Sequence, residues 1–190
     1  MAEIQEVFVL DPVPILLCNY FIGCLFLFGC FDKVRAFPMF RATLDDYQLV
    51  PSAFLNISSV IVIVLELGIG IGAFKPTLAP FSMFCGAVLL LVYSAAIGIN
   101  LARGRNNIDC GCTGPATRQF ISKWLVLRNF GLIAIAITGM VMTNQRALYV
   151  VDFALVGVAL LGAMVLYGAV NQLLANATRF DALHSDLEAS

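Results

Sequence analysis

Charged side chains are scarce in this sequence. Only 12% of its 190 residues are Asp, Glu, Lys or Arg, whereas 61% are hydrophobic. A soluble domain carries about 25% charged residues, so this chain has too few to cover a surface that faces water. Most of the surface must therefore face lipid. The formal net charge of −1 supplies no basic field, which argues against nucleic acid as a partner.

We expect no secretory leader, and the sequence has no internal repeats and a single histidine. The residues before the first apolar run include Glu3, Glu6 and Asp11 but no Lys or Arg, unlike a signal peptide. We therefore expect the first helix to remain in the mature protein. His184 lies in the polar stretch 176–190, which we expect to fray into solvent as a tail after a single domain of residues 1–175. A catalytic role for His184 is not expected.

Long apolar runs are abundant. A hydrocarbon core of about 30 Å requires roughly 20 apolar residues in a helix, and in lipid each backbone polar group must pair within its own segment. The sequence therefore predicts an all-α, polytopic membrane helix bundle with five transmembrane helices. The five segments are Val13–Phe31, Ser52–Phe74, Thr77–Leu101, Trp124–Met142 and Leu148–Leu174.

Glycines are clustered in two of these spans. In membranes, small residues let neighbouring helices approach closely, so we expect each of them to mark a helix contact. They are Gly68, Gly70, Gly72, Gly157, Gly162 and Gly168.

The segment Asp32–Pro51 is too polar to span a membrane. Thr43-Leu-Asp-Asp46 resembles a capping box that opens a short helix. We expect this helix to lie along the interface with its large apolar side chains in the headgroup layer. Those side chains are Phe37, Met39, Phe40, Leu44 and Tyr47.

Lys and Arg are distributed unevenly between the two sides that the five spans define. Lys75 and Arg146 lie on one side, and the other eight counted residues lie on the opposite side. Arg128, one turn into the fourth span, is not counted because it can snorkel toward the eight-charge side. Since cytoplasmic loops carry the excess of positive charge, we expect a periplasmic N-terminus, with the C-terminus and the Arg103–Lys123 loop in the cytoplasm. The eight residues are Lys33, Arg35, Arg41, Arg103, Arg105, Arg118, Lys123 and Arg179.

Cys110-Gly111-Cys112 is the sharpest chemical feature of the sequence. The two thiols can form a disulfide only if the chain folds back, because their Cα atoms must come within about 7 Å. Gly111 permits such a turn, and a small strained ring would be a labile, reactive disulfide. Nearby arginines favour the reactive thiolate. An inert structural pair remains an alternative; a zinc site is less favoured because the loop offers two thiols and no histidine.

Four further cysteines lie in the predicted spans. Cys18, Cys24 and Cys30 recur every six residues, a spacing that turns a helix by about 600°, so no two of them can bond. We interpret Cys18 and Cys24 as small hydrophobic residues. Cys30 should lie near the membrane face of the Cys110–Cys112 pair and is a candidate resolving thiol, whereas Cys85 should lie near the opposite face with Cys18.

Glu66 is the only acidic residue well inside a predicted span. An intramembrane carboxylate is costly and indicates a functional site. A protonated or hydrogen-bonded glutamate that holds helices together explains it equally well. In both cases we expect Glu66 to face the interior of the bundle.

These residues resemble the MauE family of methylamine utilisation proteins and, more distantly, DoxX-like membrane families. The resemblance rests on residues 100–129, "NLARGRNNIDCGCTGPATRQFISKWLVLRN", with support from "DKVRAF" (32–37) and "LELGIGIGAF" (65–74). It implies a bacterial inner-membrane factor for the processing, transport or maturation of the beta (small) subunit of methylamine dehydrogenase, working with a periplasmic thioredoxin-like protein. The family's thiol pair falls on Cys110 and Cys112, without an established catalytic role.

Two function classes follow: a thiol–disulfide redox protein, or a non-catalytic membrane anchor or transport component. The sequence identifies no quinone, haem or flavin site, so its cofactors are unknown.

The sequence also raises a conflict, because the implied client matures in the periplasm whereas the charge bias puts Cys110 and Cys112 in the cytoplasm. Three resolutions are open: the charge rule misleads here, the pair is structural, or reducing equivalents cross the membrane. The last is least favoured, since thiol exchange requires direct sulfur contact.

Overall fold

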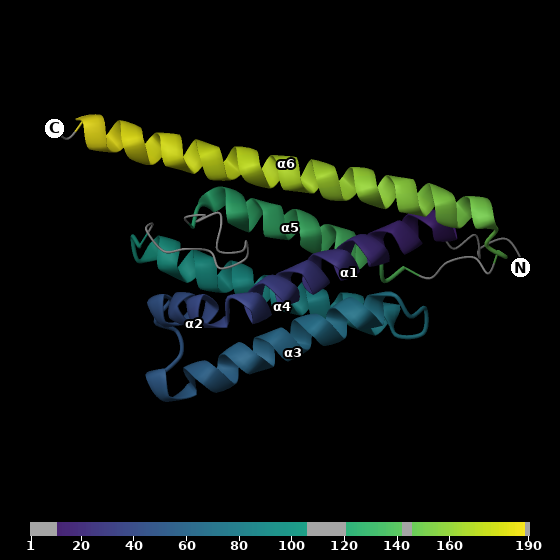
Figure 1. The fold of residues 1–190 in the computed structure, drawn as a ribbon, viewed down its shortest axis with the longest axis horizontal. Coiled ribbons are helices and arrows are strands. Elements are labelled where there is room, and N and C mark those ends of the chain that lie inside the picture. Colours follow the sequence, from purple (N-terminus) through teal and green to yellow (C-terminus); the bar gives the residue numbers. More distant parts are fainter. Residues whose placement is uncertain (1–10, 106–120, 142–145, 189–190) are drawn as a thin grey trace, which may run out of the picture.

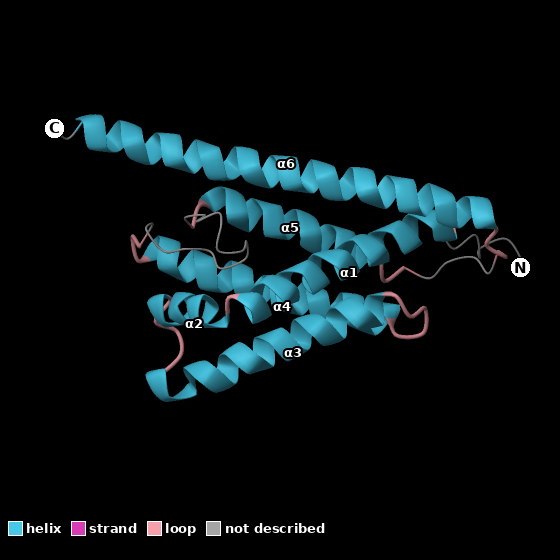
Figure 2. Ribbon diagram, viewed as in Figure 1, coloured by secondary structure: helices cyan, strands magenta, loops and turns pink. Residues whose placement is uncertain are grey.

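The computed structural model describes residues 11–105, 121–141 and 146–188, with side chains as far as Ala177, and its regular elements there are all helical (Figures 1 and 2). The expected all-α class is therefore confirmed. The elements are α1 (Pro12–Arg35), α2 (Phe37–Asp46), the short 3-10 turn η1 (Ser52–Phe54), α3 (Leu55–Ala73), α4 (Ala79–Ala102), α5 (Lys123–Thr138) and α6 (Val150–Glu188).

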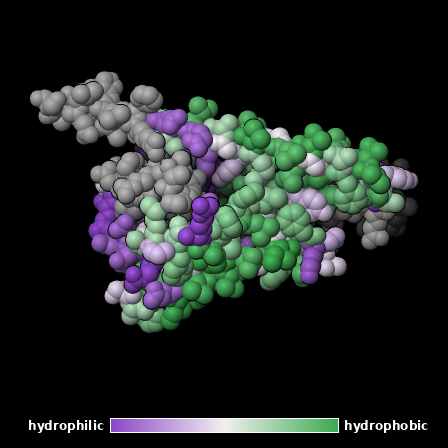
Figure 3. All heavy atoms as spheres, in the orientation of Figure 1, coloured by the Kyte–Doolittle hydropathy of each residue, from purple (hydrophilic) through white to green (hydrophobic). Residues whose placement is uncertain are grey.

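Four helical segments of the described chain are long and apolar enough to cross a membrane. They are Pro12–Arg35, Ser52–Ala73, Ala79–Ala102 and Val150–Ala177. The remaining expected span forms α5, which has 16 residues and so reaches only about 24 Å at 1.5 Å per residue. Apolar side chains cover a broad band of the surface, and hydrophilic ones gather at the end where α2 lies (Figure 3). This banded surface is the one expected of a protein in a bilayer.

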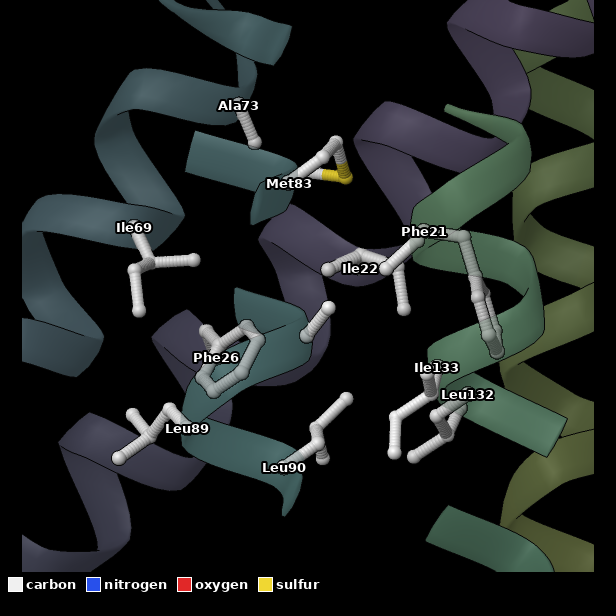
Figure 4. Close-up of a cluster of buried hydrophobic side chains, with 12 residues drawn as sticks. Phe21, Ile22, Phe26, Ile69, Ala73, Met83, Leu89, Leu90, Leu132 and Ile133 are labelled. Atoms are coloured by element: carbon white, nitrogen blue, oxygen red, sulfur yellow. The ribbon is translucent and has the colours of Figure 1, made fainter. Parts of the chain in front are cut away.

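The core is formed where α1, α3, α4 and α5 meet (Figure 4). Phe26 of α1, Ile69 of α3, Met83 of α4 and Leu132 of α5 are among its buried side chains. By contrast, α6 runs along the outside of the bundle (Figure 1).

Close helix packing is confirmed for two of the six glycines. A Cβ atom on Gly70 would lie 3.3 Å from the carbonyl oxygen of Gly23, so α3 touches the backbone of α1 there. A Cβ on Gly72 would collide with Ser82 of α4. The expectation was wrong for the other four glycines, because a Cβ atom built on any of them would meet no neighbouring atom within 4 Å. They are Gly68, Gly157, Gly162 and Gly168.

The first span and the short helix after it have different bounds from those expected. The first helix continues beyond Phe31 to Arg35, and α2 begins at Phe37 with proline in its first turn, a position that suits the fixed φ of proline. The capping-box interpretation was wrong, because Thr43 lies inside α2 and its hydroxyl donates to the Met39 carbonyl at 3.1 Å.

Two aromatic side chains of this region were also misplaced by the sequence. Phe40 and Tyr47 are buried in the protein rather than lying in a headgroup layer. The reason is that α2 packs against α3 and brings the Phe40 ring to 5.4 Å from the Lys33 ammonium. A short helix after the first span was nevertheless correctly expected.

The C-terminal helix is longer than the sequence suggested. It continues through Glu188, so residues 176–188 extend a helix where a frayed tail was expected. The side chain of His184 lies outside the described part. At the N-terminal end of α6, the Arg146 guanidinium donates to Asp152 at 3.2 Å and to Asp11 at 3.3 Å. These contacts connect the start of α6 to the start of α1.

Candidate functional site

A buried ion pair joins α1 to α3. The Lys33 ammonium donates to both Glu66 carboxylate oxygens, at 2.8 Å and 2.9 Å. Only 5% of Lys33 and 2% of Glu66 is exposed. Glu66 therefore faces the bundle interior, as the sequence predicted. The sequence placed Lys33 in the polar segment after the first span, whereas it lies in the last turn of α1 and is buried, so it is not one of the free surface charges in the count.

Tyr93 of α4 completes this cluster. Its hydroxyl donates to Glu66 Oε1 at 2.7 Å, and its ring centroid lies 5.7 Å from the Lys33 ammonium. Three helices thus converge on one carboxylate. We call Lys33, Glu66 and Tyr93 the buried triad.

Local sequence explains how Lys33 reaches the interior. The first helix continues for one turn past its apolar run, so Lys33 follows the face that α1 presents to α3. Gly29, one turn earlier, leaves space: a Cβ there would lie 3.5 Å from Lys33 Nζ and 3.8 Å from both Glu66 oxygens. Sequence reasoning missed the pairing, although a lysine close to the end of a span is a natural partner for an intramembrane carboxylate.

Two cavities adjoin the buried triad, and Lys33 and Tyr93 lie on the walls of both. The larger cavity, about 390 Å³, lies between α1, α4, α5 and α6 and is also bounded by Glu66. The smaller, about 230 Å³, is enclosed by residues of α1 to α4 and the α2–η1 connection, and is mainly apolar. The triad therefore stands between two spaces large enough for small molecules.

A second polar cluster lies on the wall of the larger cavity. Arg128 of α5 donates to Asn171 Oδ1 of α6 at 2.7 Å and to Asn129 Oδ1 at 3.3 Å, and its guanidinium lies 6.0 Å from the Tyr167 ring. Arg128 was expected to snorkel outward. It bridges α5 and α6 because Asn171 supplies an acceptor inside the protein.

The four described cysteines form no disulfide, in agreement with the angular argument for Cys18, Cys24 and Cys30. Cys30 is buried, and its thiol lies 3.6 Å from the Ile63 carbonyl, to which it donates. Cys110 and Cys112 lie outside the described residues, so the expectation that Cys30 is their nearest cysteine stays a prediction. Within the described ranges, no group of three or more His, Cys, Asp or Glu side chains could hold a metal ion.

Comparison with known proteins identifies one family and several relatives. Residues 11–142 match the family model described as "Methylamine utilisation protein MauE". Proteins named "Methylamine utilization protein MauE" from Paracoccus denitrificans and Methylophilus methylotrophus are 32% and 30% identical to the chain. The alignments cover 68% and 72% of this chain, respectively, and 70% of each relative.

A third relative with this name, from Methylorubrum extorquens, is 32% identical over 64% of the chain and 66% of its own length. No solved structure matches the chain. The family match ends before α6 and includes both the buried triad and the Cys-Gly-Cys stretch.

Proposed function

The chain belongs to the MauE family, and from this premise we propose that it serves maturation of the beta (small) subunit of methylamine dehydrogenase in a bacterial inner membrane. A periplasmic thioredoxin-like protein is its proposed partner. The observation that carries the proposal is the family match over residues 11–142, because this stretch contains α1 to α5 and the Cys110-Gly111-Cys112 motif.

A five-span arrangement fits this role. In Figure 1, α4 and α6 run in the same direction and α5 runs in the opposite one, so the chain must return across the bundle between them. Leu127, Phe130 and Ile137 are exposed apolar residues of α5, as lipid contact requires. A span shorter than the hydrocarbon core is tolerated through local thinning of the bilayer. Five spans put the termini on opposite faces, with the N-terminus in the periplasm by the charge bias.

The proposed chemistry is thiol–disulfide exchange at Cys110 and Cys112. A thiolate of one protein attacks a disulfide sulfur of the other and displaces a thiolate there, and the second thiol of the attacking protein resolves the mixed disulfide. One dithiol becomes a disulfide as the other disulfide becomes a dithiol, so no further reactant is needed. Arg103, Arg105 and Arg118 flank the pair in sequence and favour its thiolate form.

Replacement of the thiols tests this role. We expect Cys110→Ser and Cys112→Ser, singly and together, to abolish accumulation of the disulfide-complete small subunit while the membrane level of the variant stays normal. Cys18→Ser and Cys85→Ser are matched controls, because these thiols lie in α1 and α4 and form no disulfide. The readout is the amount of mature subunit, with its disulfides scored by alkylation and mass spectrometry.

The opposite result identifies the second function class. If the subunit matures normally in the double variant but not in a strain without the chain, the protein acts as a membrane anchor or transport component. Cys30→Ser is a useful third arm. Because Cys30 is buried and hydrogen bonded, we expect this substitution to leave maturation intact.

A further inference from the structure

The larger cavity lies beneath α6 and has mainly apolar walls. Leu25 and Phe26 of α1, Leu132 of α5 and Met164 of α6 contribute to its lining. Gly168 of α6 is also on the wall, and a Cβ built there meets nothing within 4 Å. A cavity of about 390 Å³ is large enough to bury the head of a small ligand. Such walls favour a lipid-soluble molecule.

The same wall carries a hydrogen-bond donor without an acceptor. Asn129 is only 2% exposed, and in the described part of the chain its Nδ2 has no hydrogen-bond partner. Its amide orientation is constrained, because Oδ1 accepts from Arg128 at 3.3 Å. A buried amide donor with no acceptor is costly, and in lipid no water is present to compensate.

Lys33 supplies a second donor at this cavity. An ammonium group has three protons to donate, and the two hydrogen bonds of Lys33 both go to Glu66. The charged side chains on this wall balance one another, because Lys33 and Arg128 stand against Glu66 and Asp32. A ligand at this wall therefore gains no net attraction from being an anion. A neutral acceptor fits these donors.

We propose that this cavity binds a neutral lipophile whose head group carries one or two carbonyl oxygens, with Asn129 and Lys33 as the donors to those oxygens. A lipid-soluble quinone and a neutral acylglycerol both have this chemistry. The site is independent of the thiol exchange proposed above, because it involves none of the cysteines.

Binding to the purified full-length chain in detergent tests the proposal. Titration calorimetry would use a decyl-benzoquinone, a monoacylglycerol and, as the carbonyl-free comparator, decylbenzene. We expect saturable binding of at least one carbonyl ligand, and the one that binds identifies the source. Binding of neither, or equally tight binding of decylbenzene, would overturn the proposal.

Paired variants locate the binding. Asn129→Leu should weaken binding about tenfold, which corresponds to one buried hydrogen bond, whereas Asn19→Leu removes a buried amide elsewhere in the bundle and should leave the affinity unchanged. Gly168→Phe should fill the cavity and abolish binding. Gly162→Phe is its control, since Gly162 also faces open space but is not on the cavity wall. Equal effects within either pair would place the ligand elsewhere and refute the assignment.

Discussion

At the scale of single residues, the ion pair between Lys33 and Glu66 is the most consequential contact. Removing two charges from water costs several kcal/mol per ion, and their attraction offsets this only when the remaining donors and acceptors are also satisfied. Two hydrogen bonds from Lys33 and one from Tyr93 satisfy the carboxylate, and the third ammonium proton is the one assigned above to the ligand. Each member of the buried triad therefore depends on the others.

This dependence predicts a strong non-additivity. Glu66→Leu leaves the Lys33 ammonium buried without its counter-charge and should lower the free energy of unfolding by about 3–5 kcal/mol. The double variant Lys33→Met/Glu66→Leu replaces both charges with apolar groups and should recover most of that loss. Denaturant unfolding in detergent micelles measures both values. A double variant no more stable than Glu66→Leu would show that the pair is not the reason for the loss.

At the scale of elements, the contact between α1 and α3 depends on glycine. Backbones approach here because Gly23 and Gly70 have no side chains: a Cβ on Gly23 would lie 2.8 Å from Ala73 Cβ. Such an approach increases the van der Waals packing between the two helices, which is one of the main attractions between helices in lipid. The same close approach brings Lys33 and Glu66, which lie further along these two helices, within hydrogen-bonding distance of each other.

We therefore expect Gly23→Ala to be destabilising. The added methyl group meets Ala73 Cβ, which cannot rotate away, so α1 and α3 must separate at a cost of about 1–3 kcal/mol. Gly68→Ala is the matched control on α3, since a Cβ there meets nothing within 4 Å, and it should be close to neutral. Thermal melting followed by size-exclusion chromatography compares the two. Similar melting temperatures would contradict the close-contact argument.

At the scale of the whole molecule, the proposed five spans and their proposed orientation make a prediction that fusion reporters can test. Alkaline phosphatase is active only outside the cytoplasm, so a fusion within the Arg103–Lys123 loop should be inactive and a fusion at Arg146 should be active. An active loop fusion would reverse the orientation and remove the conflict with a periplasmic client. Equal behaviour of the two fusions would mean that α5 does not cross the membrane.

Thiol labelling gives a second prediction at this scale. On intact cells, a membrane-impermeant maleimide should not label Cys110 or Cys112 before or after reduction if the loop is cytoplasmic. On inverted vesicles it should label them, and only after reduction if they form a disulfide. Cys30 should remain unlabelled in both preparations because it is buried between α1 and α3. Labelling on intact cells would contradict the charge-based orientation.

Much of this architecture was accessible from sequence, because in lipid the constraints are local. Backbone groups must pair within each helix and apolar length must match the bilayer, so the helical class and the approximate bounds of the apolar segments follow from composition along the chain. The interior position of Glu66 follows in the same way, since a carboxylate facing lipid at that depth is too costly.

The tertiary structure decided which polar groups meet. Lys33 lies beside a loop in sequence, yet one additional helical turn and the space left by Gly29 bring it to Glu66. Arg128 finds Asn171, which is 43 residues away, and the open surroundings of Gly157 and Gly162 depend on where α6 lies. Contacts of this kind depend on the relative rotation and position of helices, which periodicity along one segment does not contain. The cavities beside the buried triad arise from the same packing, so only the assembled bundle reveals them.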